Sequence, residues 1–251
     1  MPKTYDEEDT LVIMGRTAHA PLGPELSLLL WNMNKGRAKT WHADFERLKQ
    51  GKDLLLLQEA VLKPASKWIF EDCETFEWVM ARSYHYQLQQ SQTGVKTGAG
   101  TSSLAQQSHT SPDQEPILRT PKMLLCTTYP LADHQDCLLV INVHAINFVS
   151  VNKYARQLEQ IKTAASDHTG PLILGGDFNN WNRARRKHLD RMIRDLQLDE
   201  VPLERSAALS HMPHRMDYIF FRDLKVLDSQ VHTNIKSSDH FPITVRLSTL
   251  N

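Results

Sequence analysis

Short apolar runs recur along the chain, and each is bounded by polar or turn-forming residues. Such runs are typical of strands buried on both faces, because a half-buried strand alternates and a solvent-facing helix repeats every three or four residues. The runs are Leu26 to Trp31, Leu54 to Leu57, Met123 to Cys126, Leu138 to Val143, Leu172 to Leu174, Tyr218 to Phe221 and Ile243 to Leu247. We predict a strand at each of them.

Between some of these runs, apolar residues repeat at the spacing of amphipathic helices. They are Tyr154, Leu158, Ile161 and Ala165, and further along Leu189, Met192, Ile193 and Leu196. Strands interleaved with helices indicate an α/β protein whose sheets are covered on at least one face.

The domain organisation follows from length and from the lack of a linker. A chain of 251 residues suffices for one large domain with a substantial core. We predict an N-terminal extension over residues 1–25, which mixes acids, prolines and a short apolar run, and a single domain over residues 26–251. The stretch from Ser91 to Pro116 has the Ser, Thr, Gln and Gly content of a long flexible loop, although such loops are uncommon inside domains.

Composition limits the choice of partners and location. Lys plus Arg equals Asp plus Glu, at 29 each, so there is no net charge to attract nucleic acid or an anionic membrane, and any attraction must be local. Three unevenly spaced cysteines, Cys73, Cys126 and Cys137, argue against a disulfide framework or a cysteine-rich zinc site. The early apolar run Leu11 to Met14 is too short for a signal peptide or membrane span. We expect a cytoplasmic protein with no membrane contact.

Polar residues of similar kinds follow four of the predicted strands. They are Asn32 and Asn34, Gln58 and Glu59, His144 and Asn147, and Asp177 and Asn179. Because ligands of open α/β sheets gather outside the strand ends, these side chains are expected to converge on one cleft.

Each of these residues also has a structural explanation when considered alone. An Asn after a strand is commonly a turn residue, His144 fits a hydrogen-bonded core histidine, and Asp177 fits a turn. Glu59 after four leucines is different, because burying an acid is costly without a partner or a metal. The recurrence of the same residue types at successive strand ends favours a functional site.

These residue types suit phosphoester hydrolysis. The reaction requires neutralisation of charge on the phosphoryl oxygens, an aligned water and help for the leaving oxygen. Magnesium prefers oxygen ligands and keeps several waters, so one or two carboxylates such as Glu59 and Asp239 suffice. A histidine is then available for acid, base or phosphate-binding work.

Six motifs, in this order, resemble the endonuclease/exonuclease/phosphatase superfamily, which includes DNase I-like enzymes. They are Trp31-Asn32-Met33-Asn34, Gln58-Glu59, His144-Ala145-Ile146-Asn147, Gly176-Asp177-Phe178-Asn179, Met216-Asp217-Tyr218 and Ser238-Asp239-His240. Within it, the chain is most similar to bacterial YafD-like proteins, through Glu115-Pro116-Ile117-Leu118-Arg119 and Val143 to Phe148. The resemblance implies a four-layer α/β/β/α sandwich of two packed mixed sheets flanked by helices, in which Ser91 to Pro116 is partly strand and partly cleft-edge loop.

The resemblance also implies roles for individual residues. Glu59 corresponds to the principal metal ligand, with Asn32 and Asp239 nearby, for Mg²⁺ or Mn²⁺. Asp177 corresponds to the residue that orients or deprotonates the attacking water. The implied phosphate-binding residues are Asn34, Asn147 and Asn179.

The remaining implied roles concern two histidines. One residue of the first motif differs from the pattern of the repair endonucleases. His240, paired with Asp217, is expected at the scissile phosphate, and His144 is a candidate acid or phosphate donor. Asn34 stands where many repair endonucleases carry an aspartate, which removes one charge from the metal site and argues against abasic-site repair.

Substrate choice depends on a basic run that follows the fourth motif. Contacts to nucleic acid are expected from Trp181 by stacking and from Arg183, Arg185 and Arg186 by charge, although a solvated helix face explains the same run. Nucleic acid is therefore the first substrate hypothesis. The alternatives are a small soluble or lipid phosphate and a catalytically silent binding protein, and no obligate protein partner is inferred.

Overall fold

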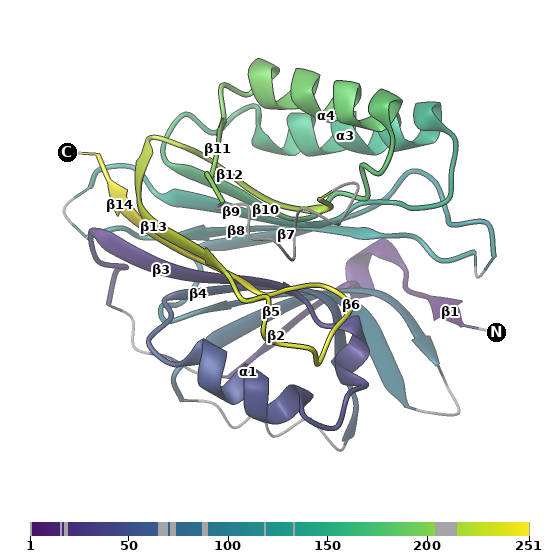
Figure 1. Ribbon diagram of the computed structural model, residues 1–251, viewed down its shortest axis with the longest axis horizontal. Coiled ribbons are helices and arrows are strands. Elements are labelled where there is room, and N and C mark those ends of the chain that lie inside the picture. The colour runs from purple at the N-terminus through teal and green to yellow at the C-terminus, as the bar shows by residue number, and fades with distance from the viewer. Residues whose placement is uncertain are drawn as a thin grey trace.

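The computed structural model describes residues 2–15, 17, 20–64, 70, 74–86, 90–117, 119–132, 134–203 and 215–250. Two β-sheets lie face to face, with helices on both outer surfaces (Figure 1). This architecture confirms the predicted four-layer sandwich. Among the described helices, none is both long and apolar enough to cross a bilayer.

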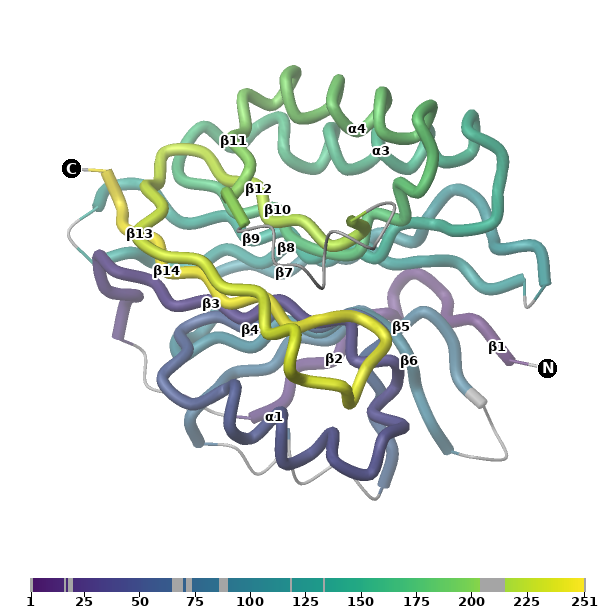
Figure 2. Tube along the Cα trace, in the orientation of Figure 1, coloured from purple at the N-terminus to yellow at the C-terminus, as the bar shows by residue number. Residues whose placement is uncertain are grey.

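The first sheet brings distant parts of the chain together. In strand order it contains β1 (Lys3–Thr4), β5 (Glu77–Tyr86), β6 (Ser91–Ala99), β4 (Leu54–Leu62), β3 (Glu25–Asn32), β14 (Ile243–Thr249) and β13 (Leu224–Val231), with β2 (Leu11–Met14) also paired to β5. Figure 2 shows the yellow C-terminal strands beside purple β3. The predicted N-terminal extension thus contributes β1 and β2, both antiparallel to β5.

The second sheet carries most of the predicted catalytic residues. Its order is β11 (Asp199–Glu200), β12 (Asp217–Arg222), β10 (Leu172–Asp177), β9 (Leu138–His144), β8 (Met123–Tyr129) and β7 (Ala105–Thr110). Helices α3 (Val151–Ala165) and α4 (Arg183–Asp195) cover its outer face, and α1 (Trp41–Lys49) covers the first sheet (Figure 1). Short 3-10 turns, η1 (Glu7–Asp9) and η2 (Asn34–Gly36), complete the described elements.

The apolar runs are continuous because both faces of each central strand are covered. In β3, Leu28 and Leu30 pack between the sheets, whereas Leu29 and Trp31 pack against α1 and its neighbours. Every predicted run lies in a strand and both predicted helices are present, so these expectations are confirmed.

The segment Ser91 to Pro116 is not the long loop that its composition predicts. It contains β6 and β7, as the family resemblance implies. Small residues are required in β6 because a Cβ on Gly98 would overlap the indole of Trp78 from β5. The local apolar pattern does not reveal such a strand, since its bulk is supplied by a neighbour.

The cysteines described by the structure carry no disulfide. Cys126 is a buried free thiol and Cys137 a partly buried one, while Cys73 lies outside the described residues. Leu118 of the YafD-like motif also lies outside them.

Candidate active site

Strand register aligns three of the predicted site residues. Asp177, at the end of β10, pairs with His144 at the end of β9 and with Asp217 at the start of β12. Residues paired across neighbouring strands point to the same face of a sheet. The register therefore places an imidazole and two carboxylates in one row at the sheet edge.

The glycine pair before Asp177 allows this register. At Gly176 the φ angle is 157°, and a Cβ there would overlap the carbonyl oxygen of Val143 on β9. Only glycine permits β10 to approach β9 so closely, which explains the Gly-Gly-Asp sequence.

Asp177 is held from both sheets. Its Oδ1 accepts a hydrogen bond from the Asn179 backbone N at 3.0 Å, and its Oδ2 accepts one from Asn32 Nδ2 at 3.2 Å. Burial, and then the charge of Asp217, raise the pKa of Asp177 to about 7. A carboxylate with this pKa is suited to accept a proton near neutral pH.

His240 forms a charged pair with Asp217. Its Nδ1 lies 2.7 Å from Asp217 Oδ2, and its Nε2 lies 3.9 Å from Asp177 Oδ2. Burial lowers the pKa of His240, but the charge and hydrogen bond of Asp217 outweigh this effect and raise the pKa to about 10. The ring is therefore an imidazolium at neutral pH, with Nε2–H available as a donor.

The Ser-Asp-His motif explains how this loop is anchored. Ser238 Oγ donates to the Asn32 carbonyl at 2.7 Å, and the Trp31 indole donates to the His240 carbonyl at 3.1 Å. The loop before β14 is thus fixed to the end of β3, over 200 residues away in sequence.

His144 differs from His240 in that its imidazole is held neutral. Its Nε2 lies 3.5 Å from Asp177 Oδ2 and 3.2 Å from Lys122 Nζ. Burial, and then the charge of Lys122, hold the pKa of His144 well below its ordinary value. A neutral imidazole accepts at Nε2 from Lys122, so the two site histidines are suited to different tasks.

Glu59 reaches the site through an irregularity in β4. The β4–β6 register shifts between Leu57 and Ala60, and Glu59 has a φ of 47°. Such bulges redirect a side chain, and unusual backbone conformations concentrate at functional sites. The Glu59 side chain is 25% exposed and faces Lys35 Nζ at 3.7 Å, so it is a carboxylate open to a ligand.

One group of described residues brings potential metal ligands together, and a second set is implied by the family resemblance. Ligand atoms of Asp177, Asp217 and His240 lie within 4.8 Å of one another. In that group, however, Nδ1 of His240 is engaged by Asp217 at 2.7 Å. The set implied by resemblance consists of oxygens from Glu59, Asn32 and exposed Asp239, the ligand type that magnesium and manganese prefer.

The three Asn side chains that were predicted to bind phosphate differ in which polar atoms are already hydrogen-bonded within the protein. Asn147 Oδ1 accepts from the Trp181 indole at 2.9 Å and from the Phe148 backbone at 2.8 Å, so its Nδ2 is the part left for a substrate. Asn179 is buried, and its Nδ2 donates to the Ala145 carbonyl at 2.9 Å. Asn34 donates its backbone N to Asn32 Oδ1 at 3.2 Å.

The prediction that Arg185 contacts nucleic acid is wrong. Arg185 is 0% exposed, and its guanidinium donates to the carbonyls of Ile146, Asn179 and Val149 at 2.8 to 3.0 Å. It joins α4 to the loops that carry Asn147 and Asn179. The helical spacing of its neighbours could not reveal this, because the acceptors belong to other segments.

The other members of the basic run differ in exposure and in ion pairing. Arg186 is paired with Asp190 at 2.7 Å and Glu200 at 3.3 Å, which balances its charge. Arg183 is exposed, and Trp181 is 41% exposed. Nucleic-acid contacts by Arg183, Arg186 and Trp181 remain predictions.

Replacing Arg185 with methionine is expected to destabilise the fold by about 2 to 4 kcal/mol, because three carbonyls lose their donor. Urea unfolding measures the effect. Arg183→Met, on the exposed start of the same helix, is the matched control and should stay within about 0.5 kcal/mol of the parent. Similar losses in both variants would contradict the anchoring role.

Sequence reasoning missed three charged residues at the site. Lys35 follows the first motif directly, whereas Lys122 and Glu115 lie on the approach to β8. Lys122 Nζ is 3.5 Å from Glu115 Oε1, which also accepts from the Asn147 backbone at 3.0 Å. Position beside a motif was a usable signal for Lys35, but nothing local distinguished Lys122.

Comparison with known proteins agrees with this fold. A model of the endonuclease/exonuclease/phosphatase family matches residues 29–240. A UPF0294 protein of Vibrio parahaemolyticus is 34% identical over 237 residues, covering 90% of this chain and 79% of that protein. The crystal structure of an endonuclease/exonuclease/phosphatase from Beutenbergia cavernae superposes with a TM-score of 0.67 at 16% identity, over 90% of this chain and 72% of that one. A mannosyl-6-phosphatase of Bacteroides thetaiotaomicron gives a TM-score of 0.65 at 15% identity, over 88% and 99%.

Proposed function

The chain belongs to the endonuclease/exonuclease/phosphatase family, and from that premise we propose that it is a divalent-metal-dependent phosphoester hydrolase. The observation that carries the proposal is the hydrogen-bonded group at the meeting point of the two sheets. There Asn32 and Asn179 hold Asp177 beside the His240–Asp217 pair. A proton acceptor and a proton donor thus lie 3.9 Å apart, close enough to act on one substrate.

The proposed reaction assigns one task to each of these groups. Asp177 accepts a proton from the attacking water. The Nε2–H of His240 donates to a phosphoryl or leaving oxygen, and Asp217 keeps the ring oriented and charged. Neutral His144 accepts from Lys122 at Nε2, so it orients the Lys122 ammonium and can accept from a water.

Glu59 is the proposed principal metal ligand, with Asn32 and Asp239 as further oxygen donors. The ion pair between Glu59 and Lys35 spans 3.7 Å, which leaves the carboxylate available. Mg²⁺ or Mn²⁺ bound there would neutralise charge on the phosphoryl oxygens.

Replacing Glu59 with glutamine is expected to raise the Mg²⁺ concentration for half-maximal turnover at least about tenfold, because changes around a metal commonly cost that much. Titration calorimetry with Mn²⁺ measures the affinity independently of turnover. Glu25→Gln, on the exposed start of β3, is the matched control. Unchanged Mn²⁺ affinity in Glu59→Gln would exclude this ligand assignment.

Within this activity, we place a small phosphoester ahead of nucleic acid as the substrate. Two of the arginines that favoured nucleic acid are internally engaged, Arg185 in the core and Arg186 in ion pairs. The name of one fold neighbour, a mannosyl-6-phosphatase, provides a precedent in that protein for a small substrate.

The proposal is tested with the purified chain and a substrate panel. Single-stranded DNA, duplex DNA, RNA, bis(p-nitrophenyl) phosphate and simple phosphomonoesters are incubated with Mg²⁺ or Mn²⁺, and then with excess chelator. We expect metal-dependent release of product from a small ester and none in chelator. Undiminished turnover in chelator would refute metal dependence, cleavage of nucleic acids alone would refute the substrate class, and no turnover would favour the silent binding protein.

A further inference from the structure

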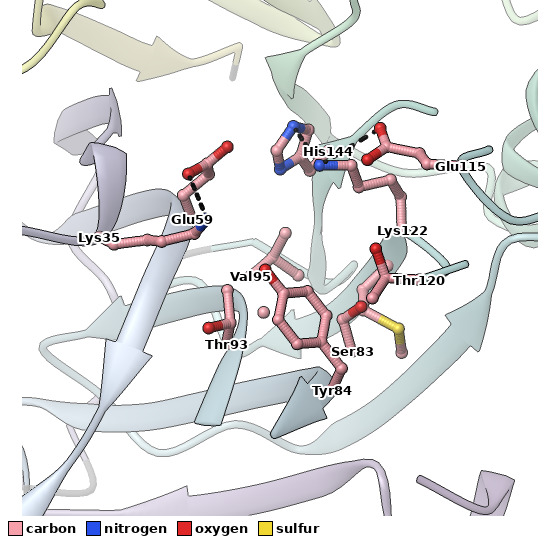
Figure 3. A pocket seen from close by; sticks show the side chains of 12 residues that line it. Lys35, Glu59, Ser83, Tyr84, Thr93, Val95, Glu115, Thr120, Lys122 and His144 are labelled. Carbon is pink, nitrogen blue, oxygen red and sulfur yellow. Dashed lines mark hydrogen bonds and ion pairs between the residues drawn. The ribbon is translucent and has the colours of Figure 1, made fainter. Parts of the chain in front are cut away.

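A pocket of about 100 Å³ adjoins Glu59 and His144. Lys35 and Glu59 stand on one side of it, and Lys122 and Glu115 stand on the other (Figure 3). A cavity needs roughly 10 to 15 Å³ to hold one water, so this pocket has room for several. A phosphate or carboxylate group fits such a space.

The interior of the pocket is polar. Ser83 and Tyr84 from β5 and Thr93 from β6 line it between the two lysine-bearing sides (Figure 3). The Ser83 hydroxyl donates to the Pro121 carbonyl at 2.5 Å, so it helps to hold the strand that leads to Lys122. The Thr93 hydroxyl and the two ammonium groups are donors that suit an anion better than an apolar group.

The two lysines are incompletely matched by their acids. Lys35 Nζ lies 3.7 Å from Glu59 and Lys122 Nζ lies 3.5 Å from Glu115, longer than the ~2.7 to 2.9 Å of a strong charged hydrogen bond. When the Glu59 carboxylate binds a divalent cation, it no longer balances Lys35. The pocket then carries a positive charge that an anion can neutralise.

We propose that this pocket binds a second anionic group of the substrate, with Lys35 and Lys122 as its cations. The proposal rests on the proposed function and narrows it. The substrate class is a small phosphoester that carries a further phosphate, sulfate or carboxylate a few bonds from the scissile ester.

Direct binding tests the pocket without turnover. Propane-1,3-bisphosphonate and propylphosphonate differ by one anionic group, and neither has a phosphoester bond to hydrolyse. Calorimetry in the presence of Mg²⁺ is expected to show at least about tenfold tighter binding of the bisphosphonate. This preference should fall severalfold in Lys35→Met and in Thr93→Val, and it should be unchanged in Lys39→Met, an exposed lysine outside the pocket. Equal affinity for the two phosphonates would overturn the proposal, as would an equal loss in Lys39→Met.

Turnover measurements distinguish the proposed anion pocket from the proposed hydrolase activity. Bisphosphates of two-, three- and four-carbon diols are compared with the matching hydroxyalkyl phosphates, and the ratio of their kcat/KM values is measured. We expect the ratio to favour one bisphosphate, mainly through KM, and to fall in Lys35→Met. Turnover of all esters without any preference would refute the pocket while leaving the hydrolase intact. Absence of turnover would refute the hydrolase, and the phosphonate affinities would still decide the pocket.

Discussion

His240→Ala is expected to lower the metal-dependent turnover of a small phosphoester by about 10³- to 10⁴-fold. The variant loses the imidazolium that Asp217 holds at 2.7 Å, and with it a charged donor 3.9 Å from the proton acceptor Asp177. The kcat/KM for bis(p-nitrophenyl) phosphate in Mg²⁺ measures the loss.

A second histidine provides the control for this variant. His232 lies outside the site and contacts Thr244 at 2.9 Å, so His232→Ala should retain turnover within a few fold. Circular dichroism establishes that both variants fold. Near-parental turnover of folded His240→Ala would remove this residue from the proposed reaction.

Asp177→Asn is expected to reduce turnover by about 10²- to 10⁴-fold, because an amide cannot accept the proton of the attacking water. The amide has nearly the same shape, and its oxygen can still accept from the Asn179 backbone. Two hydrogen bonds to Oδ2, from the side chains of Asn32 and Asn179, are perturbed, which costs about 1 to 3 kcal/mol, while the cost of burying a carboxylate disappears.

Comparing turnover with thermal stability distinguishes chemistry from folding for this residue. We expect Asp177→Asn to melt within a few degrees of the parent while turnover collapses. Asp228→Asn, on exposed β13, should change neither quantity. If turnover fell only in proportion to a loss of folded protein, Asp177 would be a structural residue.

The local sequence was sufficient for the central strands and two helices. In β3, β4, β9 and β10 every residue of the apolar run is largely shielded from water, so hydrophobicity alone marked them. The same criterion failed for β6, where small residues pack beneath Trp78, and for α1, which was not predicted at all. A strand or helix whose packing partner lies elsewhere in the chain has a weak local signal.

The motifs identified the chemistry-bearing residues, because a phosphoester site needs carboxylates, amides and histidines whatever their surroundings. Their surroundings decided what each one can do. Asp217 makes His240 an imidazolium, whereas burial and Lys122 keep His144 neutral, although both are histidines beside the same carboxylate.

The sequence by itself therefore determined the family, the positions of the core strands and the identity of Glu59, Asp177 and His240 as site candidates. Only the tertiary structure decided that Arg185 is a buried anchor and that Lys35 and Lys122 face one pocket. The physical reason is that charge state, burial and hydrogen-bond partners arise from contacts between segments far apart in the chain. The hydrogen bond from Asn32 to Asp177 crosses 145 positions, and no local pattern encodes such a contact.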